Sequence, residues 1–199
     1  CGERMELDEF QRASLYVSTY VLFSSIAEGK TPPQEVEAFF ESMGVDLPQT
    51  GAQASENLRH LKASEVRLDL PATVRANLHN HVKVFMAQAG YEAPEPADSA
   101  TSMAAFAARL AVEAYQARLT GQTRGSQAEL KLVRFLQTHL LPTLEKAEAS
   151  DENLRHILKT VAELLRTDTN HLTRKLAEGM KNGYFHGDVG NTNRHQQLC

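Results

Sequence analysis

The chain has 199 residues, of which 42% are hydrophobic and 23% are charged, and its formal net charge is −4. This length can bury a full hydrophobic core, and this composition is typical of a folded chain rather than a disordered one. The weakly acidic balance, without a long basic run, argues against nucleic acid as a partner, and no stretch approaches the roughly 20 apolar residues of a membrane span, so we expect no stable membrane insertion.

The only two cysteines are Cys1 and Cys199, one at each end of the chain. Two residues placed in this way do not make a disulfide framework, and such usage fits a reducing compartment. Cys1 is compatible with a processing boundary ahead of Met5 or with the lipidated start of a mature lipoprotein. The cysteine pattern as a whole favours a cytoplasmic location.

The N-terminal half, residues 1–90, is predicted to form four helices. Apolar residues recur at helical spacing from Phe10 to Ile26, and Gly29 ends the first helix. Thr31–Gln34 has the order of a capping box with proline in the first turn, which predicts the start of a second helix. The four predicted helices cover residues 5–28, 31–43, 55–64 and 72–89.

Residues 91–98 are predicted to be a stiff acidic connector, because Pro94 and Pro96 remove two backbone donors and restrict the residues before them. Three carboxylates share this segment, and we expect them to be exposed. An apolar stripe follows at i, i+3, i+4, i+7, i+8 and i+11, which predicts a helix that ends at Gly121. The stripe consists of Met103, Phe106, Ala107, Leu110, Ala111 and Ala114, and the candidate N-caps are Asp98, Ser99 and Thr101.

The C-terminal half, residues 99–182, continues with three more helical segments after that central helix. A capping box at Ser126–Glu129 predicts the first, which Pro142 bends or ends, and the others cover residues 150–167 and 172–180. Residues 183–199 are poor in apolar side chains, so we expect a disordered tail. No alternation typical of strands occurs. The predicted fold is an all-α, single-domain antiparallel helical bundle of about seven to eight helices, with two halves joined by the acidic hinge.

Two short motifs suggest a family. The hinge reads Glu95-Pro96-Ala97-Asp98-Ser99, and a later helix contains His139-Leu140-Leu141-Pro142-Thr143. In this order and spacing they resemble the E-P-x-D-H and H-L-x-P-W motifs of the TorD/DmsD/NarJ family of redox-enzyme maturation chaperones. Ser99 stands where the family has histidine, and Thr143 where it has tryptophan. The pattern of Asn153–Leu165 is also similar to the penultimate helix of that family.

The resemblance implies a cytoplasmic chaperone rather than an enzyme. Such a protein binds the twin-arginine signal peptide of an apo redox enzyme, often a molybdoenzyme, and delays export until the cofactor is inserted. Its partners are the signal peptide and the body of the client enzyme, it needs no cofactor of its own, and it is a monomer or homodimer. The predicted peptide-binding residues combine connector carboxylates for the arginines with an apolar groove wall: Glu92, Glu95, Pro96, Asp98, Ser99, Phe106 and Leu110. The alternative is that the acids are only a solvated linker and the stripe is only core.

A different class of function arises from a repeated pentapeptide. Glu56-Asn-Leu-Arg-His60 and Glu152-Asn-Leu-Arg-His156 each place Glu and His at i and i+4 on one helix face, a spacing that can chelate a metal. Two such helices could form a metal site in a helical bundle, as a metalloprotein or metal-dependent enzyme. The competing interpretation is a recurring helix start or an internal duplication, in which Ser55 and Ser150 or Asp151 act as caps.

Overall fold

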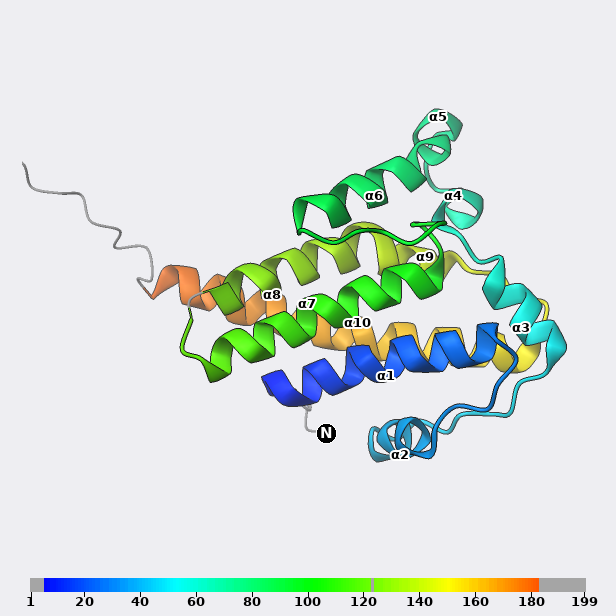
Figure 1. The fold of residues 1–199 in the computed structure, drawn as a ribbon, viewed down its shortest axis with the longest axis horizontal. Helices are drawn as coiled ribbons and strands as arrows, with labels where there is room; N and C mark the ends of the chain where they lie inside the picture. Colours follow the sequence, from blue (N-terminus) through cyan, green and yellow to red (C-terminus); the bar gives the residue numbers. More distant parts are fainter. Residues whose placement is uncertain (1–5, 123, 183–199) are drawn as a thin grey trace, which may run out of the picture.

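The computed structural model of the protein describes residues 6–122 and 124–182. Within these ranges every regular element is a helix, and one isolated β-bridge joins Lys62 to Ser99. The prediction of an all-α helical bundle is therefore confirmed (Figure 1). Cys1, Cys199 and the predicted tail, residues 183–199, lie outside the described residues.

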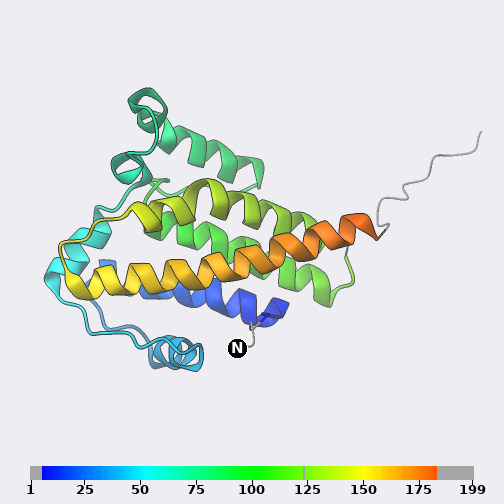
Figure 2. The ribbon, with the colours of Figure 1, turned by 180° about the vertical axis from the view of Figure 1, so that it is seen from behind.

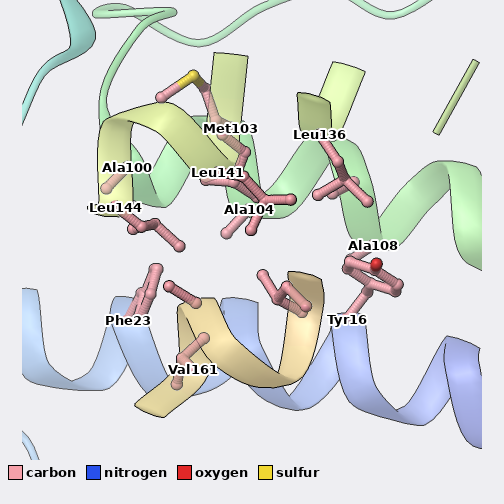
Figure 3. Packing of buried hydrophobic residues seen from close by; sticks show 14 of the residues in the cluster. Tyr16, Phe23, Ala100, Met103, Ala104, Ala108, Leu136, Leu141, Leu144 and Val161 are labelled. Atoms are coloured by element: carbon pink, nitrogen blue, oxygen red, sulfur yellow. The ribbon is translucent and has the colours of Figure 1, made fainter. Parts of the chain in front are cut away.

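Four long helices form the centre of the fold. α1 (Glu9–Ala27) packs along α7 (Ala100–Leu119), and α8 (Arg124–Phe135) and α10 (Glu152–Lys181) complete the group (Figure 1 and Figure 2). Because α1 precedes the acidic connector and α7 follows it, the two halves of the chain share one hydrophobic core. Figure 3 shows side chains from both halves meeting there, among them Tyr16, Phe23, Ala104, Leu141 and Val161.

Five shorter helices lie between α1 and the connector. They are α2 (Gln34–Ser42), α3 (Ala52–Arg59), α4 (Ala63–Val66), α5 (Ala72–Ala76) and α6 (Leu78–Gln88). The predicted segment 55–64 is thus divided between α3 and α4, and the predicted segment 72–89 between α5 and α6. α6 lies beside the connector, which returns from its end to the start of α7 (Figure 1).

The two capping boxes predicted from the sequence do not form. α2 begins after Pro33 with no side-chain cap, so Thr31–Gln34 is a proline-fixed approach to the helix. α8 begins before Ser126–Glu129, which places that segment inside the helix. The capping box that is present joins Asp8 and Gln11 at the start of α1, where each side chain accepts from the backbone of the other residue.

Pro142 changes the geometry of its helix without ending it. α8 runs into a π-helical turn, η1 (Leu136–Leu140), and then into α9 (Leu141–Lys146). Proline has no N–H to offer to the carbonyl of Thr138 four residues earlier. Arg67, at the end of α4, donates its Nη1 to that carbonyl at 3.0 Å. The predicted bend therefore takes the form of a wider turn whose free carbonyl is satisfied from α4.

The two predicted helices at residues 150–167 and 172–180 are one continuous helix, α10. Three of the four polar residues between them, Asp168, Thr169 and His171, are buried inside the bundle and do not break the helix. Asp168 is 2% exposed and accepts two hydrogen bonds from Nε of Arg12, at 2.9 and 3.0 Å, and one from the hydroxyl of Tyr16 at 3.3 Å. Both partners come from α1, so a buried ion pair takes the place of the missing apolar residues at this level of the bundle.

Candidate peptide-binding groove

Asp98 ends the acidic connector and is buried, with 2% of its surface exposed. Its backbone carbonyl accepts the N–H of Ala63, and its Oδ2 accepts the N–H of Ser64, both at 2.9 Å. α4 begins without a capping side chain of its own, so Asp98 satisfies the free donors of its first turn. The expectation that Asp98 is an exposed carboxylate is therefore wrong, because the side chain caps a neighbouring helix.

Ser99 is the N-cap of α7 and is also buried. Its Oγ accepts the backbone N–H of Ser102 at 3.1 Å, and the two hydroxyl oxygens lie 2.8 Å apart. The β-bridge to Lys62 and a hydrogen bond from Ala100 N to the carbonyl of Leu61, at 2.9 Å, fix the same point of the chain. In this structure Ser99, which was predicted to bind the peptide, thus holds the connector to the helices. Pro96, another predicted binding residue, is half-buried.

Glu95 is exposed, but its carboxylate already has two partners on α6. Lys83 Nζ lies 2.6 Å from Oε1, and His79 Nε2 lies 3.2 Å from Oε2. The hydrogen bond from Lys83 lowers the pKa of Glu95, and the Coulombic attraction of Lys83 and His79 acts in the same direction. The opposite nitrogen of His79, Nδ1, lies 3.5 Å from Oδ1 of Asp98. This imidazole therefore sits between two connector carboxylates and joins α6 to the connector.

Phe106 and Leu110 are buried, at 0% and 1% exposed, so they do not form a groove wall in this structure. The ring of Phe106 packs against three aromatic rings, with centroid distances of 4.7 Å to Phe135, 5.4 Å to Tyr91 and 6.0 Å to Phe85. These rings come from α6, from α8 and from the start of the connector, so the side chain of Phe106 lies in an aromatic cluster of the core. The alternative interpretation of the stripe, as core, is correct for both residues.

A groove does open at the connector, with a volume of about 610 Å³. α1 supplies one side, the connector supplies the other, and small residues of α7 form the floor. The lining consists of Tyr20, Tyr91, Glu92, Ala93, Pro94, Thr101, Ser102 and Ala105. Of the three connector carboxylates, Glu92 is the one in this lining, and it is exposed. The structure thus separates the predicted acids into one that faces the groove and two that hold the connector.

The sequence did not point to the two tyrosines of the groove. Tyr20 lies on the predicted first helix, where it is one of several apolar residues at helical spacing, and it is 36% exposed. Tyr91 lies just after Gly90, and the guanidinium of Arg109 is 5.4 Å from its ring centroid. A signal that could have singled out Tyr20 is the absence of charge between Ala13 and Ala27, which leaves this aromatic side chain on an uncharged helix surface.

His139, from the second motif, is buried at 5% exposed between the rings of Phe85 and Phe135. Desolvation by burial lowers its pKa to about 4, and the positive charge of Arg67 contributes in the same direction. Its carbonyl accepts the hydroxyl of Thr143 at 2.7 Å. The neutral imidazole therefore acts as a core side chain at the π-helical turn.

The alternative metal site is not assembled. Glu56 and His60 contact each other at 3.0 Å on α3, but nowhere in residues 6–122 and 124–182 do three or more His, Cys, Asp or Glu side chains come together as metal ligands. Glu152 and His156 are exposed on α10. Of the predicted caps, Asp151 is the N-cap of α10 and accepts the N–H of Leu154 at 2.8 Å, whereas Ser55 lies inside α3.

The repeated pentapeptide joins two helix starts instead. Asn57 Oδ1 accepts the backbone N–H groups of Ser150 and Asp151, at 2.9 and 3.1 Å. In the second copy, Asn153 Nδ2 donates to the carbonyl of Gln49, at 2.8 Å, in the loop before α3. The asparagine of each copy therefore makes hydrogen bonds to the backbone just before the helix that carries the other copy. This reciprocal contact explains the asparagine in both copies without a metal.

Comparison with known proteins adds no identification. No protein-family model matches the chain, and no curated protein matches its sequence. Within the part of the chain that the structure describes, no helix has both the length and the apolar character to cross a membrane.

Proposed function

We propose that this protein is a cytoplasmic chaperone, not an enzyme, that binds the twin-arginine signal peptide of an apo redox enzyme at the connector groove and delays export until cofactor insertion. The proposal joins the motif resemblance to one structural observation. That observation is an exposed carboxylate, Glu92, in a groove with aromatic side chains on both sides. The proposed client is a redox enzyme of the molybdoenzyme class. Its body follows the signal peptide that the groove binds.

The chemistry of the groove suits an arginine followed by apolar residues. A guanidinium can form two parallel hydrogen bonds with one carboxylate, and its flat faces stack on aromatic rings. Glu92 offers the carboxylate, and the rings of Tyr20 and Tyr91 offer the aromatic faces. Arg109 already lies over Tyr91, so the ring of Tyr20 is the more accessible face. The floor of Thr101, Ser102 and Ala105 is small enough to leave room for a peptide backbone.

The other two acids support the proposal in a less direct way. Asp98 caps α4, and Glu95 is bound to Lys83 and His79, so the connector is fixed between its two prolines and again after the second one. A carboxylate on a segment that is already ordered loses little conformational entropy when a ligand binds. We therefore assign ligand contact to Glu92 and positioning of the connector to Glu95 and Asp98.

The test measures the affinity of the full chain for a fluorescent peptide that contains two adjacent arginines and a following apolar segment. We expect Glu92→Gln to weaken binding about tenfold or more, since loss of one partner of a carboxylate–guanidinium pair costs 2 kcal/mol or more. Glu37→Gln, at an exposed glutamate on α2, removes the same charge away from the groove and should bind like the wild type.

Two results would count against the proposal. If the wild-type chain does not bind the peptide, the chaperone function is wrong. If it binds but Glu92→Gln and Glu37→Gln have the same affinity as the wild type, the peptide lies elsewhere on the protein. A peptide in which both arginines are replaced by lysine should bind more weakly, because lysine lacks the planar fork of the guanidinium.

A further inference from the structure

α1 carries an unusual exposed surface for a helix in a weakly acidic protein. Between Ala13 and Ala27 it has no charged residue, and Arg12 before this stretch is buried in its ion pair with Asp168. Most of the helix is buried, and the outer strip that remains includes Phe10, Val17 and Tyr20, which are 60%, 38% and 36% exposed. Isolated exposed apolar residues are common, but these three share one face of a single helix.

This strip, defined as Phe10, Val17 and Tyr20, leads directly from the groove. Tyr20 lines the groove, and the ring of Phe10 lies at the other end, 5.6 Å from the ring of Tyr115 on α7. α1 and α7 lie side by side along this distance (Figure 1). Ten residues of helix separate Tyr20 from Phe10, which at 1.5 Å per residue is roughly 15 Å. The groove and the strip therefore form one surface with an acid at one end and apolar side chains along the rest.

We propose that this strip binds the apolar segment that follows the arginine pair of the signal peptide, with the peptide running from Glu92 past Tyr20 and Val17 to Phe10. The inference rests on the proposed function and assigns a direction to the ligand. Its basis is complementarity: a cation followed by uncharged apolar residues matches a carboxylate followed by an uncharged apolar strip. A path of roughly 15 Å holds about ten residues of helix or four to five of extended chain.

Two peptides distinguish this surface from the groove itself. Both contain the arginine pair, and in one the apolar segment is retained while in the other it is replaced by serines. On the wild type we expect the apolar peptide to bind more tightly. Val17→Asp should weaken the apolar peptide at least fivefold and leave the serine peptide unchanged, because it places a charge under the apolar segment only.

Matched controls separate this effect from a general loss of stability. Val84→Asp introduces the same change at a more exposed valine, 55% exposed on α6, and should bind both peptides like the wild type. Phe10→Ser provides a second variant on the strip without a new charge, and it should also weaken only the apolar peptide. Far-UV circular dichroism of each variant checks that the helices are intact.

The outcomes are distinguishable from those of the first test. If Val17→Asp and Phe10→Ser bind the apolar peptide like the wild type while Glu92→Gln does not, the strip is not the path of the apolar segment, and the proposed function stands. Equal weakening of both peptides by Val17→Asp would also overturn the inference. If the wild type binds neither peptide, the proposed function fails and the inference fails with it.

Discussion

Replacing Asp98 with alanine tests whether the connector carboxylates have different roles. The substitution removes the hydrogen bond from Ser64 N to Oδ2, a 2.9 Å bond to a charged acceptor on a residue that is 2% exposed. Hydrogen bonds to charged groups contribute about 1.5–3 kcal/mol. The contact of His79 with Asp98, at 3.5 Å, adds little because that imidazole is partly exposed. We therefore expect Asp98→Ala to lower the free energy of unfolding by about 1.5–3 kcal/mol.

For a chain of this size, such a loss lowers the melting temperature by about 3–12 °C. Thermal and urea unfolding followed by circular dichroism measure it, with Glu95→Ala as the control. Glu95 is exposed, so its removal should change the free energy of unfolding by no more than about 0.5 kcal/mol. Asp98→Asn keeps an oxygen acceptor for Ser64 N and should lie between the alanine variant and the wild type. If Asp98→Ala unfolds like the wild type, the cap on α4 does not contribute to stability and the assignment of Asp98 as a positioning residue is refuted.

Two further predictions concern other parts of the fold. Burial lowers the pKa of His139 to about 4, so on acidification the unfolded chain takes up the proton before the folded chain does. The free energy of unfolding should therefore be highest above pH 6.5 and fall by up to about 3 kcal/mol towards pH 4. Urea unfolding across this range should show a smaller fall for His139→Gln, and an equal fall would contradict the assignment. Asn57→Ala removes the acceptor of two N–H groups at the start of α10 and should cost about 1 kcal/mol, whereas Asn153→Ala, which loses one exposed bond, should cost less. Equal stability of Asn57→Ala and the wild type in urea would contradict the reciprocal contact.

The sequence predicted the helices whose apolar residues keep a regular period. α1 and α7 appear within a few residues of their predicted ends, because glycines with positive φ follow both of them. The pattern predicts a helix boundary wrongly where a polar residue replaces an apolar one inside the core. Asp168 interrupts the pattern of α10, and its burial is explained by partners more than 150 positions earlier in the chain, Arg12 and Tyr16, which the local pattern does not reveal.

The candidate site was predicted as a segment but not as a surface. The sequence shows that three carboxylates share the connector, but it does not show which way each side chain points. Asp98 is buried because α4, more than thirty residues earlier, lacks a cap of its own, and Glu95 is neutralised by Lys83. Phe106 was assigned to a groove wall because an apolar stripe has the same period whether it faces core or ligand. These outcomes depend on contacts between distant segments, which periodicity does not encode.

The hinge motif differs at one position from the E-P-x-D-H pattern that it resembles, and this difference has a structural counterpart. Where the family has histidine after the aspartate, this chain has Ser99, and that serine caps α7 with a short side chain in a buried position. An imidazole nevertheless lies beside the aspartate, because His79 of α6 places Nδ1 3.5 Å from Asp98 and Nε2 3.2 Å from Glu95. An imidazole therefore meets two carboxylates at this hinge, and α6 supplies it. Since this histidine also joins α6 to the connector, any movement of α6 would change the position of the segment that carries Glu92.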